Sequence, residues 1–195
     1  MSTQQTPPPR KFIIQMSGAP GSGKSTLASL LGSSTGAVVI DHDRLRSALT
    51  TIPFDQAARF AYNIQWDLVQ HFAQQGHNIV IDSTCNYPEV LDRGSKCAAQ
   101  HGCAYWYVEC RAKDINLLDR RLRARNSLPS QRTAVDSPPQ AHAAVAAAGG
   151  GEDQRAVFRK WMEDPCRPAE DKVIIVDSTG EPEQLRDQVL ARMLG

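Results

Sequence analysis

The sequence lacks the features that would direct it to a membrane, a secretory route or a polyanion. No uninterrupted apolar run reaches the roughly 18 residues that cross a bilayer, and Met1–Arg10 is polar and proline-rich, without the apolar segment of a signal peptide. Lys and Arg total 22 against 21 Asp and Glu, so the net charge of +1 creates no global field for nucleic acid or anionic lipid. We therefore expect a cytoplasmic protein with a disordered tail over residues 1–10, in which any polyanion binds locally.

Cysteine and histidine are too scattered to suggest a structural metal site. The five cysteines form no C-x-x-C pair and the five histidines no H-E-x-x-H element, so unpaired and mostly buried thiols are expected. A chain of 195 residues, 41% of them hydrophobic, has room for one domain but not for two with a linker. We predict a single domain over residues 11–195.

Short apolar runs alternate with longer segments of helical period, the pattern of a parallel sheet covered by helices. Phe60, Ile64, Leu68 and Phe72 recur every four residues and predict an apolar helix stripe that packs on the sheet, as does a similar stripe over 185–193. The candidate strands, nearly continuous apolar runs typical of strands buried on both faces, are Phe12–Ser17, Ala37–Asp41, Asn78–Asp82, Ala104–Cys110 and Lys172–Asp177.

Residues 127–151 interrupt this alternation. They are largely Pro, Ala, Gly, Ser and Gln and end in Gly149–Gly151. Such a composition buries little apolar surface and so does not offset the entropy lost on ordering. We predict a mobile low-complexity insertion, either a neutral spacer or a lid that closes over a substrate.

The strongest functional signal is a phosphate-binding loop of the pattern G-x-x-x-x-G-K-[ST]. It follows the strand Phe12–Ser17 and opens a segment of good helix formers at Leu27–Leu31. Glycines let backbone N–H groups converge on phosphate oxygens, and the helix N-terminus adds the positive end of its dipole. Lys24 is expected to reach the β- and γ-phosphates, and the Ser25 hydroxyl to ligate Mg²⁺. The predicted nucleotide-binding residues of the loop are Gly18, Ala19, Pro20, Gly21, Ser22, Gly23, Lys24, Ser25 and Thr26.

Charged residues follow the second candidate strand, at the edge where ligands bind in open α/β sheets. Asp43 and Arg46 are three residues apart, so on a helix that opens at Asp43 they share one face. In a kinase such a carboxylate orients or accepts the proton of the attacking hydroxyl, and the arginine holds an anionic substrate. The alternative is that Asp43 only caps the helix, whose basic face is solvated.

Two further elements fit the same site. Asp82 ends the third candidate strand as a Walker-B aspartate does, and is a candidate to hold Mg²⁺ through water unless it only caps a turn or helix before Pro88. Residues 111–132 form the one strongly basic stretch, in which Arg121 and Arg125 lie one helical turn apart. That spacing suits two guanidinium groups to neutralise phosphate charge in a transition state, whereas a solvated surface helix is the alternative.

On these motifs the sequence resembles the P-loop kinases that include polynucleotide 5′-hydroxyl kinases and zeta-toxin-like kinases. The matching elements are the phosphate loop, Asp43 to Arg46 as a D-x-x-R element, Asp82 to Thr84, and the paired arginines. The resemblance covers nearly the whole chain outside the tail and the insertion. It implies a nucleotide-kinase-like α/β P-loop NTPase fold, with a five-stranded parallel sheet flanked by helices and an arginine-bearing lid, that acts with ATP and Mg²⁺.

The same resemblance implies a role for each matching residue. Asp43 resembles the general base, Arg46 the substrate-binding arginine, and Arg121 with Arg125 the lid residues that contact ATP and the moving phosphoryl group. The segment Asp177–Pro182 resembles the loop that contacts adenine. Ser83 stands where polynucleotide kinases carry an acidic residue, so acceptor contacts differ there. The implied residues are Lys24, Asp43, Arg121 and Arg125 for catalysis, Ser178, Glu181 and Pro182 for the nucleotide, Asp43, Arg46, Asp82 and Thr84 for the acceptor, and Ser25 and Asp82 for the metal.

The sequence thus predicts a kinase that transfers the γ-phosphoryl group of ATP to a hydroxyl of a small molecule or nucleotide. One alternative is a polynucleotide 5′-hydroxyl kinase, which the neutral charge balance and the lack of an evident nucleic-acid module disfavour. Another is an ATP-binding switch or adaptor that acts through a partner. A switch has no need of Asp43, Arg46 and the lid arginines together, and this conjunction favours the kinase.

Overall fold

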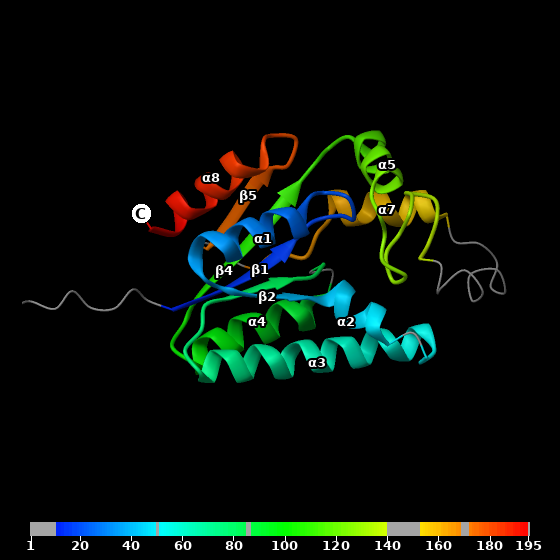
Figure 1. Ribbon diagram of the computed structural model, residues 1–195. Coiled ribbons are helices and arrows are strands. Elements are labelled where there is room, and N and C mark those ends of the chain that lie inside the picture. The colour runs from blue at the N-terminus through cyan, green and yellow to red at the C-terminus, as the bar shows by residue number, and fades with distance from the viewer. Residues whose placement is uncertain (1–10, 50, 85–86, 140–152, 169–171, 195) are drawn as a thin grey trace, which may run out of the picture.

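A computed structural model, shown in Figure 1, describes residues 11–49, 51–84, 87–139, 153–168 and 172–194. The expected tail over 1–10 and the glycine-rich end of the expected insertion lie outside these residues. No helix in the described part of the chain is both long and apolar enough to span a membrane. The cysteines within the described ranges are unpaired, and Cys97, Cys103 and Cys110 are buried, as predicted.

A five-stranded parallel sheet forms the centre of the molecule, as the apolar runs predict. Its strands are β1 (Phe12–Ser17), β2 (Val38–Asp41), β3 (Ile79–Asp82), β4 (Ala104–Arg111) and β5 (Val173–Asp177). They lie in the order β2-β3-β1-β4-β5, and every neighbouring pair is parallel. Because the chain leaves β1 toward β2 on one side and later crosses to β4 on the other, the end of β1 is a topological switch point, where open α/β sheets bind ligands.

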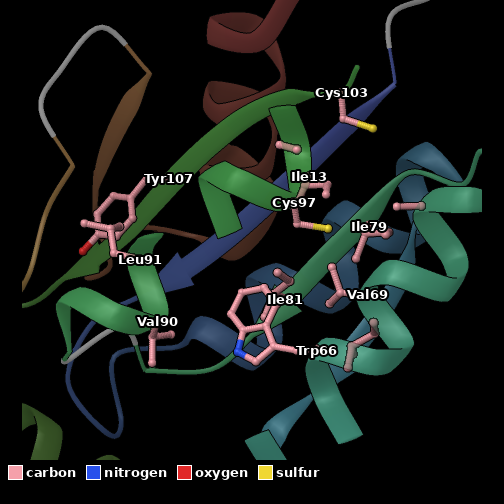
Figure 2. Packing of buried hydrophobic residues seen from close by; sticks show 13 residues of the cluster. Ile13, Trp66, Val69, Ile79, Ile81, Val90, Leu91, Cys97, Cys103 and Tyr107 are labelled. Atoms are coloured by element: carbon pink, nitrogen blue, oxygen red, sulfur yellow. The ribbon is translucent and has the colours of Figure 1, made fainter. Parts of the chain in front are cut away.

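Helices cover both faces of the sheet (Figure 1). On one face lie α1 (Lys24–Thr35) and α8 (Pro182–Leu194), where Val189 is fully buried against Ile14, Val80 and Val108. On the other lie α3 (Phe54–Gln74) and α4 (Pro88–Gln100). Figure 2 shows the second core, in which Trp66 and Val69 of α3 and Leu91 of α4 pack on strand residues such as Ile79 and Ile81.

The predicted apolar stripe of α3 packs only over its C-terminal half. Leu68 and Phe72 are partly buried against the core, but Phe60 is 40% exposed and Ile64 is 41% exposed. The N-terminal half of α3 instead packs on the short helix α2 (His42–Ala48), and its buried positions include the small Ala57. The four-residue periodicity correctly predicted a helix here. It did not predict that the two halves of the helix bury different faces.

Two more helices lie beyond the carboxyl ends of the strands (Figure 1): α5 (Ile115–Ala124) and α7 (Gln154–Glu163). Leu118 and Leu122 of α5 and Phe158 of α7 form a third apolar cluster with Val135, which comes from the expected insertion. The prediction that the insertion buries little is therefore wrong for residues 127–139. The ordering of this segment could not be predicted from its composition, because hydrogen bonds to distant residues hold much of it in place rather than a run of large apolar side chains.

Candidate active site

The loop after β1 has the geometry of a phosphate cradle. Gly18, Gly21 and Gly23 all have positive φ, at 132°, 83° and 87°, which side-chain-bearing residues rarely adopt. A Cβ at Gly18 would also collide with the carbonyl oxygen of Cys110 on β4, so this glycine lets the loop turn tightly against the neighbouring strand. The loop delivers the chain to the N-terminus of α1, which starts at Lys24.

Lys24 lies across the loop that precedes it. Its Nζ donates hydrogen bonds to the carbonyl oxygens of Gly18 at 2.9 Å and Ala19 at 3.1 Å. Burial lowers the pKa of Lys24, and the charges of Asp82 and Asp43 partly oppose this effect. The ammonium group is thus held above the loop, close to both carboxylates.

Asp82 and Ser25 meet at the opposite wall of the loop. Asp82 ends β3 and is only 5% exposed, and burial raises its pKa to about 6 although a hydrogen bond with the Ser25 side chain and the charge of Lys24 act against that rise. A hydroxyl and a carboxylate, here from the exposed Ser25 and the buried Asp82, are oxygen donors that suit Mg²⁺, which takes few protein ligands and keeps substrate phosphates and water as the others. Within the described residues no group of three or more His, Cys, Asp or Glu forms a self-sufficient metal site.

Buried hydroxyl groups also line the cleft above the loop. Ser22, Ser83 and Ser178 are 1%, 4% and 5% exposed, and their Oγ atoms have no hydrogen-bond partner among the described residues. Buried polar groups are normally paired, so three unpaired hydroxyls lining one cleft fit a polar ligand such as a nucleotide.

Asp43 lies in the first turn of α2, but it does not cap that helix. The cap is Asp41, whose Oδ1 accepts hydrogen bonds from the backbone N–H groups of Asp43 at 2.9 Å and Arg44 at 3.1 Å. The alternative role considered for Asp43, that of N-cap, is therefore filled by another residue. The Asp43 carboxylate is left for other contacts, and it interacts electrostatically with Lys24, Arg46 and the lid residue Arg125.

The two arginines predicted to belong to a lid, Arg121 and Arg125, contact different sides of the cleft. Arg121, in the last turn of α5, donates from Nη2 to the carbonyl oxygen of Ser178 at 2.9 Å. The helix ends at Ala124, so Arg125 has extended backbone angles and does not continue the face of Arg121 as the spacing suggested. Its charge acts on both Lys24 and Asp43, which places the Arg125 guanidinium near the phosphate loop and α2.

One cleft of about 1380 Å³ joins these groups. Among the predicted site residues, Gly18 and Ala19 do not line it and lie behind the loop against β4. The sequence did not identify His42, Tyr62, Gln131 or Trp161, which also line the cleft and come from helices or from the expected insertion. Predicted residues that line the cleft are Pro20, Gly21, Ser22, Gly23, Lys24, Ser25, Thr26, Asp43, Arg46, Asp82, Thr84, Arg121, Arg125, Ser178, Glu181 and Pro182.

Residues 13–147 match the family described as an AAA domain. That span contains the phosphate loop, α2, β3 and α5, and so most of the cleft described above. Among curated protein sequences none matches the chain.

Solved structures share the fold at low sequence identity. A protein from Chloroflexus aurantiacus J-10-fl, provisionally described as a kinase, aligns with a TM-score of 0.66 and 14% identity over 94% of this chain and 99% of its own. The APS kinase of Mycobacterium tuberculosis, solved with AMPPNP and APS, aligns with a TM-score of 0.62 and 20% identity over 96% of this chain and 100% of its own. A gluconokinase from Sinorhizobium meliloti 1021 aligns with a TM-score of 0.56 and 16% identity over 95% of this chain and 94% of its own. The fold is thus that of small P-loop kinases.

Proposed function

This chain belongs to the AAA-domain family, with a P-loop kinase fold, and we propose that it transfers the γ-phosphoryl group of ATP to a hydroxyl group of a small molecule or nucleotide. The observation that carries this proposal is the placement of Asp43 in the same cleft as the phosphate loop, in electrostatic contact with Lys24 and Arg125. A carboxylate between a phosphate-binding lysine and a lid arginine is where an acceptor hydroxyl must be held for an in-line attack.

The phosphate loop and its lysine act on the nucleotide. Backbone N–H groups of the loop and of the N-terminus of α1 bind phosphate oxygens, and Lys24 exchanges its carbonyl contacts for the β- and γ-phosphates. Ser25 and Asp82 would hold Mg²⁺, which neutralises phosphate charge when bound. Arg121, joined to the Ser178 carbonyl, lies between the phosphates and the segment Ser178–Pro182 that we assign to the adenine.

Asp43 and Arg46 act on the acceptor. The Asp43 carboxylate accepts a hydrogen bond from the acceptor hydroxyl, aligns its oxygen with the γ-phosphorus and takes the proton as the new P–O bond forms. Arg46, half-buried on the same helix, contributes positive charge beside it. Arg125 stabilises the negative charge that develops on the leaving ADP as the bond between the γ-phosphorus and the β,γ-bridging oxygen breaks.

The solved structures support a small acceptor. Two of the structures that share this fold are an APS kinase, solved with AMPPNP and APS, and a gluconokinase. With a net charge of +1, this chain also offers no general attraction for a polynucleotide. We therefore assign a small molecule or nucleotide as the acceptor in preference to a polynucleotide 5′ end.

The substitution Asp43→Asn tests this assignment. Asparagine keeps the size of the side chain and removes its charge, and Asp41 still caps α2, so the fold is unaffected. We expect ATP affinity, measured by titration calorimetry, to stay within about twofold, because Asp43 acts on the acceptor and not on the nucleotide. The rate of phosphoryl transfer should fall by about 10²-fold, the lower end of the range for loss of a general base. A loose transition state needs little proton abstraction from the acceptor, so the base contributes less than in other reactions.

The matched control is Asp67→Asn, at an exposed position of α3 away from the cleft. It should leave both affinity and transfer unchanged. Near wild-type transfer by Asp43→Asn would contradict the kinase assignment and favour an ATP-dependent switch.

A further inference from the structure

A tight turn over Leu128–Gln131 packs on α2 beside Asp43. The Ser130 backbone N–H donates to Ser47 Oγ at 3.3 Å, and Ser130 Oγ donates to the carbonyl oxygen of Asp43 at 3.0 Å. The Ser47 and Ser130 hydroxyl oxygens are themselves 2.7 Å apart. Because the single Ser130 hydroxyl proton is given to Asp43, Ser47 is the donor in that pair. Three hydrogen bonds therefore join a segment after α5 to a helix that precedes it by more than 80 residues.

The same turn places the Gln131 amide on the Asp43 carboxylate. Gln131 Nε2 donates to Asp43 Oδ2 at 2.9 Å, and Gln131 Oε1 accepts from the backbone N–H of Leu128 at 3.1 Å. A backbone N–H can only donate, so Leu128 fixes which end of the amide faces Asp43. The turn closes on itself through a hydrogen bond from Gln131 N to Leu128 O at 2.9 Å.

Asp43 is consequently held from three directions. Asp41 binds its backbone N–H, Ser130 binds its carbonyl oxygen, and Gln131 binds its Oδ2. A carboxylate offers about four lone-pair positions, so one bond from Gln131 fixes the side chain and leaves Oδ1 to accept a further hydrogen bond.

Lid residue Arg125 anchors this turn from its other side. Arg125 Nε donates to Ser127 Oγ at 3.3 Å, and Arg125 Nη2 donates to the carbonyl oxygen of Arg132 at 3.1 Å. The ends of the turn are thus bound by a guanidinium whose charge also acts on Asp43. The titratable groups that interact electrostatically with Asp43 come from five segments and are Lys24, Asp41, His42, Arg46, Asp82 and Arg125.

We propose that Gln131 is a positioning residue of the acceptor site, which holds the Asp43 carboxylate so that Oδ1 faces the acceptor hydroxyl while the turn stays docked on α2. The inference rests on the proposed function. The opposite role, in which Gln131 occupies the place of the acceptor and must leave before it binds, fits the structure less well. Ser130 is only 6% exposed, and the turn is bound by both α2 and Arg125, so leaving would break hydrogen bonds on two sides.

Substitutions of Gln131 distinguish these roles. With γ-labelled ATP and the acceptor labelled fastest by wild type, Gln131→Ala should lower kcat about tenfold to hundredfold, the range for one hydrogen bond to a charged group, and leave the Kd for ATP unchanged. Gln70→Ala, an exposed glutamine on α3, is the matched control and should have no effect. A Gln131→Ala variant with wild-type kcat, or with a lower KM for the acceptor at unchanged kcat, would overturn the proposal.

Gln131→Glu adds a readout that a purely structural role would not give. Two carboxylates in hydrogen-bond contact share a proton, and the protonated glutamate donates to Asp43 as the amide does. We therefore expect kcat of this variant to be low at pH 8 and to recover toward the wild-type value as the pH falls to about 6. A wild-type pH profile for Gln131→Glu would contradict the proposal.

A disulfide tests whether the turn must stay docked. The double variant Ser47→Cys/Ser130→Cys places two thiols at side chains whose hydroxyl oxygens are in hydrogen-bond contact at 2.7 Å. Treatment with oxidised glutathione should form the bond, checked by mass spectrometry against the two single variants, and transfer should persist. With the bond formed, loss of transfer that dithiothreitol restores would overturn docking as the active state.

The outcomes also separate this inference from the proposed function. If wild type labels no acceptor, the proposed function fails and the positioning role fails with it. If wild type labels an acceptor and the Asp43→Asn variant does not, but Gln131→Ala equals wild type, only the positioning role fails.

Discussion

Asp82 is a carboxylate in a place that disfavours its charge. Burial raises its pKa from 3.8 to about 6, against the opposing effects of Ser25 and Lys24. Between these two values the folded protein binds a proton that the unfolded chain releases, so the contribution of Asp82 to stability falls as the pH rises through that window. Above pH 6 the full cost of a buried charge is present in the ligand-free protein. We read this cost as the consequence of keeping an anionic oxygen ready for a metal.

The substitution Asp82→Asn should therefore have opposite effects on stability and on binding. At pH 7.5 without nucleotide the free energy of unfolding should rise by about 1–3 kcal/mol, because two pKa units correspond to roughly 2.7 kcal/mol. Near pH 4 the gain should disappear. The Mg²⁺-dependent part of ATP affinity should be lost at every pH, whereas in wild type it should weaken only as the pH falls below about 6.

Denaturant unfolding at pH 4 and 7.5 and calorimetry with and without Mg²⁺ measure the two effects, with Asp67→Asn as the exposed control. Equal stability of Asp82→Asn and wild type at pH 7.5 would show that burial does not penalise the charge. Unchanged Mg²⁺ dependence would remove Asp82 from the metal site.

At the scale of elements, the segment 127–139 joins α5 to α7. Arg132, 8% exposed, donates from Nη1 to the carbonyl oxygen of Val135 at 2.9 Å and from Nη2 to Gln154 Oε1 at 2.5 Å. Its guanidinium also lies 5.1 Å from the centre of the Trp161 ring. Asp119 of α5 accepts the Val135 N–H at 2.8 Å. One arginine and one carboxylate thus connect α5 and α7 through the segment that holds the fully buried Val135.

Replacing Arg132 by lysine should weaken the contacts of this segment with α7. Lysine keeps the charge but has neither the planar fork nor the stacking face of a guanidinium. We expect Arg132→Lys to lower the free energy of unfolding by about 1–3 kcal/mol, the cost of buried acceptors left unpaired. The same change at the exposed Arg159 of α7 should stay within about 0.5 kcal/mol in denaturant unfolding. Equal values for the two variants would mean that the segment does not bind α7 through Arg132.

The contrast between these elements explains what the sequence could predict. The strands and the phosphate loop can be predicted because each depends on a pattern of consecutive residues. Each predicted strand agrees with the structure within a residue or two. The position of the turn at Leu128–Gln131 could not be predicted, because it depends on contacts with a helix far away in the chain. One of these contacts joins Gln131 to Asp43, 88 residues apart. The sequence suggested Asp43 as a possible cap of α2, but the helix starts at His42 and the cap is Asp41.

At the scale of the whole molecule, the strand order brings the proposed nucleotide and acceptor sides of one cleft together. β1 supplies the phosphate loop, its neighbour β3 supplies Asp82, and the edge strand β2 leads into α2 with Asp43. From the other half of the sheet, β4 leads to α5 and its arginines, and β5 leads to Ser178. The proposed nucleotide side and the proposed acceptor side of the cleft are both contacted by residues 121–131, through Arg121 on Ser178 and Gln131 on Asp43.

Phosphoryl transfer from γ-labelled ATP is the most direct measurement of this account. Wild-type protein with Mg²⁺ is incubated with nucleosides, nucleotides, sugars, sugar acids and 5′-hydroxyl oligonucleotides, and labelled products and free phosphate are quantified in parallel. We predict a labelled small-molecule product formed faster than ATP is hydrolysed, about 10²-fold less of it with Asp43→Asn, and loss of both reactions with Lys24→Ala. Hydrolysis at equal rates in wild type and Asp43→Asn, with no labelled product from any acceptor, would contradict the account.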